Sequence, residues 1–280
     1  MTSPATRAPK SGPAVADGPS SSLAADRPPP RSAPVRLAAG SPERDALVAG
    51  RVVVVIDEEP VELELVVQAG PVSMDEVLPI FQGLSDLFVA RGVAKAEAEG
   101  RCVSCRAGCG ACCRQLVPIS EPEARGLARL VEEMPEPRRS QVQARFEAAL
   151  AALAPTGLIE RAMHPAEGEA RRLGLEYFAE RVACPFLEAE ACSIHPDRPL
   201  ACREYLVTSP ARNCEAPASA SIEKVRLAGD PSVALLKAGR ADTENGWLPL
   251  VLALRFVEQA PAARCDRTGP EVLREVIGRL

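Results

Sequence analysis

The chain has 280 residues, of which 46% are hydrophobic, so it is long enough to bury a core as one large domain or two small ones. Its formal net charge is −5 at pH 7, which gives no electrostatic reason to expect nucleic acid or an anionic membrane as a partner. No run approaches the roughly 18 uninterrupted apolar residues that a membrane-spanning helix needs, so we expect no integral membrane segment.

Residues 1–45 are rich in proline and serine and poor in large apolar side chains. Such a segment cannot bury enough apolar surface to offset the entropy of ordering, so we predict a disordered tail. The segment also lacks the apolar stretch of a secretory signal. We therefore expect a cytoplasmic protein, because thiolates persist and disulfides are rare in a reducing compartment.

Residues 46–72 contain two runs rich in β-branched side chains, at 51–56 and 61–67, separated by the turn-forming residues 57–60. This pattern predicts a β-hairpin. From residue 73 to about 98 the apolar side chains recur at three- and four-residue steps, which predicts an amphipathic helix. The side chains that form this stripe are Met74, Val77, Leu78, Phe81, Leu84, Leu87 and Phe88.

A capping box at Ser120 and Glu123 predicts a helix over residues 121–134. Further helical patterns cover residues 138–153 and 167–181, and a loop-rich stretch follows at 183–217. Residues 230–239, 246–259 and 270–279 suggest short helices. The expected fold class is α+β and mainly α, with a helical domain over residues 73–280 built around a metal-binding core at 102–214.

Nine of the ten cysteines fall into two patches that are far apart in the sequence. Thiolates two or three residues apart can converge on one soft cation, and Gly108 and Gly110 allow the tight backbone that this requires. Two such patches suit a metal site that clamps two chain segments together. The first patch holds Cys102, Cys105, Cys109, Cys112 and Cys113, and the second holds Cys184, Cys192, Cys202 and Cys214.

Three further residues are assigned less readily from their positions. The isolated Cys265 fits a small hydrophobic side chain better than a ligand. His195 lies three residues after Cys192, a spacing that allows a shared metal, but a lone histidine is more often a hydrogen-bonding residue. The ligand roles of Cys102 and His195 are left open.

Arg114, Arg198 and Arg203 flank the cysteines and can offset the negative charge of thiolates. For Arg114, a solvated surface position accounts for the residue equally well. Pro199 fixes its own backbone angle and restricts the residue before it, which makes the turn ahead of Cys202 stiff. We predict that Arg203 organises the second patch, because a guanidinium can donate to carbonyls or to cluster sulfur at the cofactor.

The pattern of cysteines with the segments 184–187, 192–195 and 198–203 resembles the YkgJ-type cysteine-cluster family of zinc- or iron-chelating proteins. The chain departs from the family pattern in two places. Three residues separate Cys105 from Cys109, where two are usual, and His195 stands where a tyrosine is common. The resemblance implies metal ligation by Cys105, Cys109, Cys112, Cys113, Cys184, Cys192, Cys202 and Cys214.

The cofactor implied is an iron–sulfur cluster or Zn²⁺, and a 4Fe–4S cluster is slightly favoured because it accepts ligands from distant segments. Three functions remain open at this point. The first is metal binding with a redox role. The second is a cluster-dependent protein-modifying enzyme similar to flagellin lysine N-methylase, with a protein substrate. The third is a zinc-stapled module that binds a protein partner.

Overall fold

The computed structural model describes residues 33–41, 46–238, 246–263 and 265–280. Its first part is a three-stranded sheet in the order β1-β3-β2. Strands β2 (Leu47–Ile56) and β3 (Glu59–Gln68) form the expected antiparallel hairpin. Asp57 and Glu58 both have positive φ, at 50° and 67°, as in the two-residue turns whose twist matches that of the flanking strands.

The boundary of the disordered tail was predicted too late in the chain. Residues 1–32 and 42–45 lie outside the described residues, but Val35–Ala38 form strand β1, which pairs in parallel with β3. Leu37 packs against the helix that follows the hairpin, where a Cβ on Gly83 would lie only 2.5 Å from Leu37 Cδ2. This contact is long-range, so the local composition of the segment could not indicate it.

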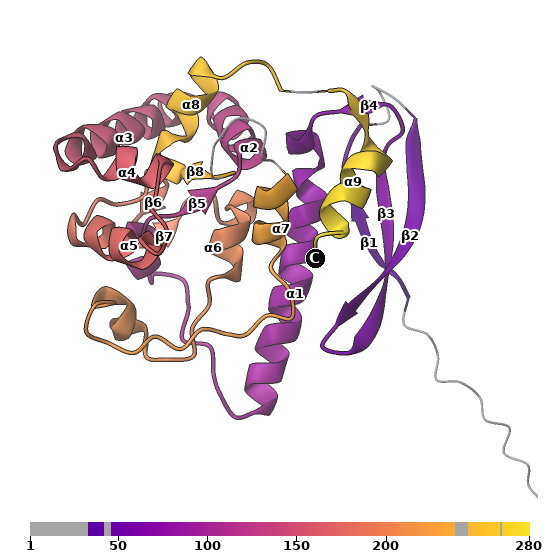
Figure 1. Ribbon diagram of the computed structural model, residues 1–280, viewed down its shortest axis with the longest axis horizontal. Helices are drawn as coiled ribbons and strands as arrows, with labels where there is room; N and C mark the ends of the chain where they lie inside the picture. The colour runs from indigo at the N-terminus through magenta and orange to yellow at the C-terminus, as the bar shows by residue number, and fades with distance from the viewer. Residues whose placement is uncertain (1–32, 42–45, 239–245, 264) are drawn as a thin grey trace, which may run out of the picture. The chain divides into compact units, whose positions relative to one another are not determined.

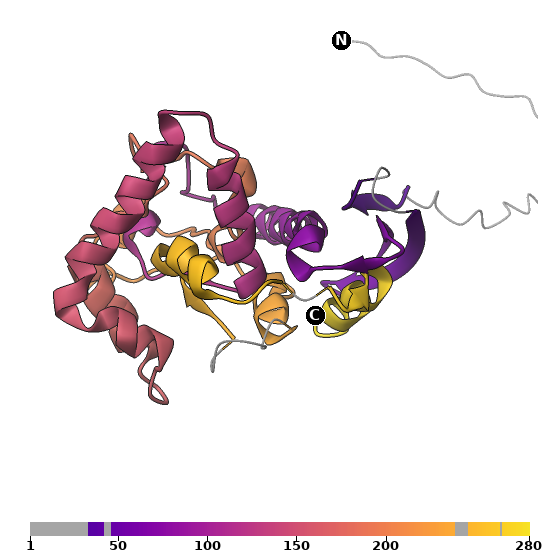
Figure 2. The same ribbon diagram turned by 90° about the horizontal axis from the view of Figure 1, so that it is seen from above.

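One face of the sheet packs against helices and forms the first hydrophobic core (Figures 1 and 2). The covering elements are η1 (Met74–Val77), α1 (Leu78–Ala98) and α9 (Gly269–Ile277), with α7 (Pro231–Ala238) against both α1 and α9. Strand β4 (Pro71–Val72) pairs with β9 (Arg267–Thr268), which joins the two ends of this part. The hairpin and the helices therefore belong to one unit, Pro34–Leu280.

The stretch Met74–Ala98 spans 25 residues with a mean hydropathy of 1.3, which is long and apolar enough to cross a membrane by length and composition alone. The helix also supplies core side chains, since Ile80 and Leu84 are fully buried and Phe81 is 1% exposed. A core helix of a globular protein has the same length and composition. The expectation of no membrane segment therefore stays a prediction.

The second part is helical and carries the helices expected at 121–134, 138–153 and 167–181 with small shifts at their ends. Of the helix expected at 246–259, only residues 253–259 are α-helical, because a short strand and a 3-10 turn come first. Helix α2 (Glu121–Glu132) begins at the predicted capping box, where Ser120 N donates to Glu123 Oε2 over 2.8 Å. Next come α3 (Arg138–Leu153), the unpredicted α4 (Leu158–Met163) and α5 (Ala170–Ala179). Strands β5 (Pro118–Ile119) and β8 (Leu248–Pro249) pair, and α8 (Ala253–Gln259) packs on α2.

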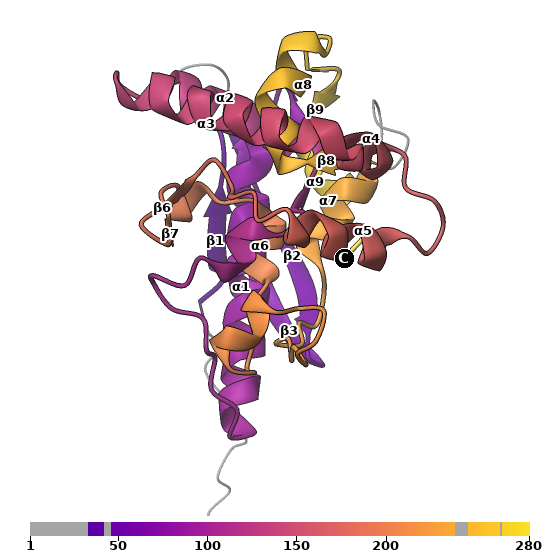
Figure 3. The same ribbon diagram turned by 90° about the vertical axis from the view of Figure 1, so that its left-hand side faces the viewer.

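The elements that carry or flank the cysteines lie beneath the α2–α4 row and beside α1 (Figure 3). They are short: η2 (Ala111–Arg114), β6 (Leu187–Glu188), β7 (Ala191–Cys192), η4 (His195–Asp197), α6 (Leu200–Glu204) and η5 (Ala211–Glu215). The fold is thus α+β and mainly α, as the sequence predicts.

Candidate metal centre

The two cysteine patches lie side by side. The amide of Cys184 donates to the carbonyl of Cys113 over 2.7 Å, and the amide of Ser104 donates to the carbonyl of Val207 over 2.9 Å. The first bond ties η2 to the start of the second patch, and the second ties the loop before η2 to the turn after α6. The prediction that the patches meet in space is confirmed.

Glycine allows the backbone of the first patch to turn and to approach the second. Gly108 has φ +82°, a conformation that L side chains rarely adopt. Gly110 allows a close approach, because a Cβ there would lie 2.8 Å from Leu187 Cδ1 on β6 and 3.2 Å from Glu190 Cα. From this turn Cys113 N donates to Gly110 O over 3.0 Å, which starts η2 and presents Cys112 and Cys113 together.

A short hairpin positions two cysteines of the second patch. Ala189 and Glu190, between β6 and β7, both have positive φ, at 48° and 59°, so the chain reverses in two residues. Phe186 is 1% exposed, and its ring meets that of Phe146 edge-on at 5.3 Å. Since Phe186 lies between Cys184 and Cys192 in the chain, its burial anchors this part of the patch on the helical core.

The thiols form two neighbourhoods that share Cys112. Cys109 and Cys214 pack in one small apolar cluster, whereas Cys184 and Cys192 pack against the core beneath α2 and α3. The thiols that raise one another's pKa fall into the same two groups. Burial raises the pKa of Cys214, with further increases from Cys105, Cys112 and Cys109. Burial also raises the pKa of Cys202 strongly, with further increases from Cys184, Cys112 and Cys192.

Cys112 differs from the other thiols whose pKa is shifted, because its pKa is lowered and theirs are raised. The side chain of Cys113 donates a hydrogen bond to it, which lowers the pKa of Cys112 and raises that of Cys113. Burial raises the pKa of Cys184 to about 12. Metal binding must therefore displace protons from most of these thiols, since only thiolates are effective ligands.

Arg203 is a buried clamp on the turn before α6. Its Nε donates to Arg198 O over 3.0 Å, its Nη1 donates to both carboxylate oxygens of Asp86 over 2.9 Å, and its Nη2 donates to Pro196 O. Its side chain is 7% exposed. Carbonyls are among the acceptors predicted for Arg203, whereas contact with a cofactor stays a prediction. The sequence did not indicate that Asp86 is the partner of Arg203, because Asp86 lies on α1, 117 residues away in the chain.

Two other predicted residues have definite contacts. Arg114 forms a two-pronged ion pair with Glu190 on the β6–β7 turn, over 2.7 and 2.9 Å, so it joins the patches instead of facing solvent alone. His195 Nε2 lies 2.8 Å from Arg198 Nη1. A guanidinium can only donate, so this nitrogen is the acceptor and its lone pair is not free for a metal.

Glu123 has a second role that the capping box did not reveal. Its Oε1 accepts from the amide of Leu200 over 2.8 Å, so one buried carboxylate joins the start of α2 to the start of α6. Burial raises the pKa of Glu123. Cys202 is therefore positioned by α2 as well as by α1.

The donor set of the two patches suits zinc or iron, since soft thiolates are the ligands that these metals take in four-cysteine sites and in iron–sulfur clusters. Among the residues that the structure describes, no three Cys, His, Asp or Glu side chains are grouped so that they could hold a single metal ion. Cys102 and Cys265 are exposed.

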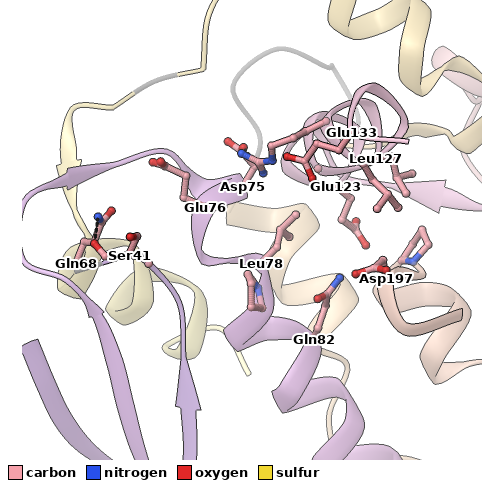
Figure 4. Close-up of a pocket in the computed structure, with 16 residues that line it drawn as sticks. Ser41, Gln68, Asp75, Glu76, Leu78, Gln82, Glu123, Leu127, Glu133 and Asp197 are labelled. Carbon is pink, nitrogen blue, oxygen red and sulfur yellow. Dashed lines mark hydrogen bonds and ion pairs between the residues drawn. The ribbon is translucent and has the colours of Figure 1, made fainter. Parts of the chain in front are cut away.

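A cavity of about 380 Å³ lies on the other side of the turn that precedes α6 (Figure 4). Asp197 and Pro199 line it, and Glu123 and Asp197 are at one end of it in the view. Several of its carboxylates already have partners within the chain: Asp75 pairs with Arg129 over 3.0 Å, and Glu123 bonds the starts of α2 and α6. No cysteine lines the cavity, so it is separate from the thiol group.

Comparison with protein families identifies the segment that carries the cysteines. Residues 104–219 match the CxxCxxCC family, described as "Putative zinc- or iron-chelating domain". The match includes all eight proposed ligands and begins after Cys102. Searches of curated proteins and of solved structures found no match. Over residues 104–219 the chain is therefore similar to the CxxCxxCC domains, whose description supports a zinc- or iron-binding role.

Proposed function

We propose that this protein binds an iron–sulfur cluster through its two cysteine patches and that the cluster has a redox role. The observation that carries the proposal is the joining of the patches, with the amide of Cys184 bonded to the carbonyl of Cys113 and thiols of both patches gathered around Cys112. The proposed ligands are drawn from Cys105, Cys109, Cys112, Cys113, Cys184, Cys192, Cys202 and Cys214.

The spread of the thiols supports a cluster over a single zinc ion. Zinc binds four thiolates with zinc–sulfur distances of about 2.3 Å, so the four sulfur atoms must lie close together around one point. Here Cys109 and Cys214 pack in one apolar cluster, and Cys184 and Cys192 pack against another. An iron–sulfur cluster is larger than one ion and takes cysteines from separate segments, which suits thiols that surround a shared centre.

A specific observation favours zinc as the second candidate. The thiols divide into one neighbourhood with Cys109 and Cys214 and another with Cys184 and Cys192, and neighbouring Cys112 and Cys113 could supply one ligand to each. Two four-thiolate zinc sites would then staple the loops to the helices. Such a protein would be colourless and would lose stability on chelation.

Cytoplasmic location is part of the proposal, because exposed thiols and a thiolate-bound cluster need a reducing compartment. The domain would then exchange electrons with a protein partner or modify a protein substrate.

Visible spectroscopy tests the proposal. Full-length protein purified without oxygen should show the broad visible absorption of an iron–sulfur cluster, and a reductant should bleach it reversibly. The Cys112→Ser variant should lose this absorption, whereas Cys265→Ser should retain it. A colourless parent protein that holds stoichiometric zinc would favour the zinc candidate and contradict the redox role.

A further inference from the structure

Three arginines near the thiols are neutralised by carboxylates. Arg114 pairs with Glu190, Arg145 pairs with Glu188 over 2.7 Å, and Arg203 pairs with Asp86. Arg198 differs, because no carboxylate of the described residues forms a salt bridge with it. Its positive charge is therefore available to the thiol group.

The backbone of Arg198 is held rigidly while its side chain is left with an unused donor. Arg203 Nε binds its carbonyl, and Pro199 follows it. Its neighbours Asp197 and Pro199 line the cavity described above, but Arg198 does not. One end of the guanidinium meets His195, whereas the buried Nε has no hydrogen-bond partner. A buried N–H group without an acceptor is unfavourable, so an acceptor is expected at this position.

Arg198 lies between Cys192 and Cys202 in the chain, and Cys202 N donates to Pro199 O over 3.0 Å, so the side chain extends from the turn that leads into the second patch. Burial raises the pKa of Cys105 in the first patch and of Cys192 in the second, and the charge of Arg198 opposes both increases. The same charge also helps to lower the pKa of Cys112, after the hydrogen bond from Cys113. The charge of Arg198 therefore acts on thiols of both patches, including Cys112.

We propose that Arg198 is a positioning residue of the metal centre, whose Nε–H donates to a metal-bound sulfur and whose charge stabilises the thiolate-rich site. This inference rests on the proposed metal-binding function. A nearby cation favours the more negative, reduced state of a redox centre, so Arg198 also raises the reduction potential of a bound cluster. Arg203 acts differently, by holding the turn from which Arg198 extends.

The test compares Arg198→Gln and Arg198→Lys with the parent in the full-length chain. The matched control is Arg212→Gln, which removes an exposed positive charge two residues from Cys214. Metal-free protein is titrated with Co²⁺ without oxygen, the sulfur-to-cobalt absorption is recorded, and affinity is obtained by competition with Zn²⁺. The melting temperature of each metal-free variant is measured in parallel.

Arg198→Gln should weaken Co²⁺ binding about 10- to 100-fold, as is typical when a partner of a metal ligand is lost. It should also shift the sulfur-to-cobalt band, with the metal-free melting temperature unchanged. Lysine should restore part of the affinity but not the band position, because it keeps the charge without the Nε–H.

Three results would overturn the inference. An Arg198→Gln variant with parental affinity and spectrum would remove the role of Arg198 while leaving metal binding intact. A fall in affinity matched by a fall in metal-free melting temperature would make the role merely structural. A parent chain that binds neither Co²⁺, Zn²⁺ nor iron would refute the proposed function itself, and the inference with it.

Discussion

Replacing Arg203 with alanine should destabilise the chain even without metal. The substitution removes the donors to Arg198 O and Pro196 O as well as the ion pair with Asp86. Asp86 is 58% exposed and regains water, so the loss of its partner costs little. The cost comes mainly from the Arg198 carbonyl, which loses its donor at about 1–3 kcal/mol when buried, and from the lost packing of the buried stem.

We expect the free energy of unfolding to fall by about 2–4 kcal/mol, since Pro196 is exposed and its carbonyl regains water. Urea unfolding of metal-free Arg203→Ala, followed by circular dichroism, measures this change. Asp86→Asn is the control and should cost less than about 1 kcal/mol, because both carbonyl bonds remain. Arg203→Lys should retain metal with intermediate stability. An alanine variant within about 0.5 kcal/mol of the parent would refute the clamp.

Cys112→Ser should lower bound metal and melting temperature together, because cluster binding and folding are coupled, whereas Cys265→Ser should change neither; metal analysis and calorimetry decide. Phe186→Ala should lower the free energy of unfolding in urea by about 3–5 kcal/mol and reduce the metal content. An unchanged metal content would show that the ring does not support the metal centre. Arg161 holds the pKa of Glu169 down at about 2, so this carboxylate contributes stability above its unfolded pKa of about 4.3 that is lost as pH falls towards 2. Glu169→Gln should flatten the acid dependence of unfolding in that window, and an unchanged slope would contradict the assignment.

Local patterns were sufficient to predict most of the longer helices and strands. The capping box at Ser120 set the start of α2, and the alternation in residues 61–67 identified β3, because both signals depend on neighbouring residues. Strand β1 was missed because it is held by pairing with β3 and by Leu37 against Gly83. Helix α4 was also missed, since a helix of six residues offers too short a period to recognise.

At the metal centre too, the sequence indicated the local features but not the long-range contacts. Cysteine spacing indicated the two patches and their meeting, because thiols two or three residues apart can converge on one metal site. Spacing could not reveal that Asp86 holds Arg203, that Glu123 binds the amide of Leu200, or that the Nε of Arg198 has no partner. These contacts join segments that are remote in sequence, so only the folded chain brings them together.

Metal and acid-labile sulfide analysis of full-length protein purified without oxygen tests the central proposal most directly. A 4Fe–4S cluster predicts iron and sulfide in equal amounts, close to four of each per chain for one cluster. Both should be lost together in the Cys112→Ser variant. Stoichiometric zinc without sulfide, or a folded parent chain that holds no metal, would contradict the iron–sulfur proposal.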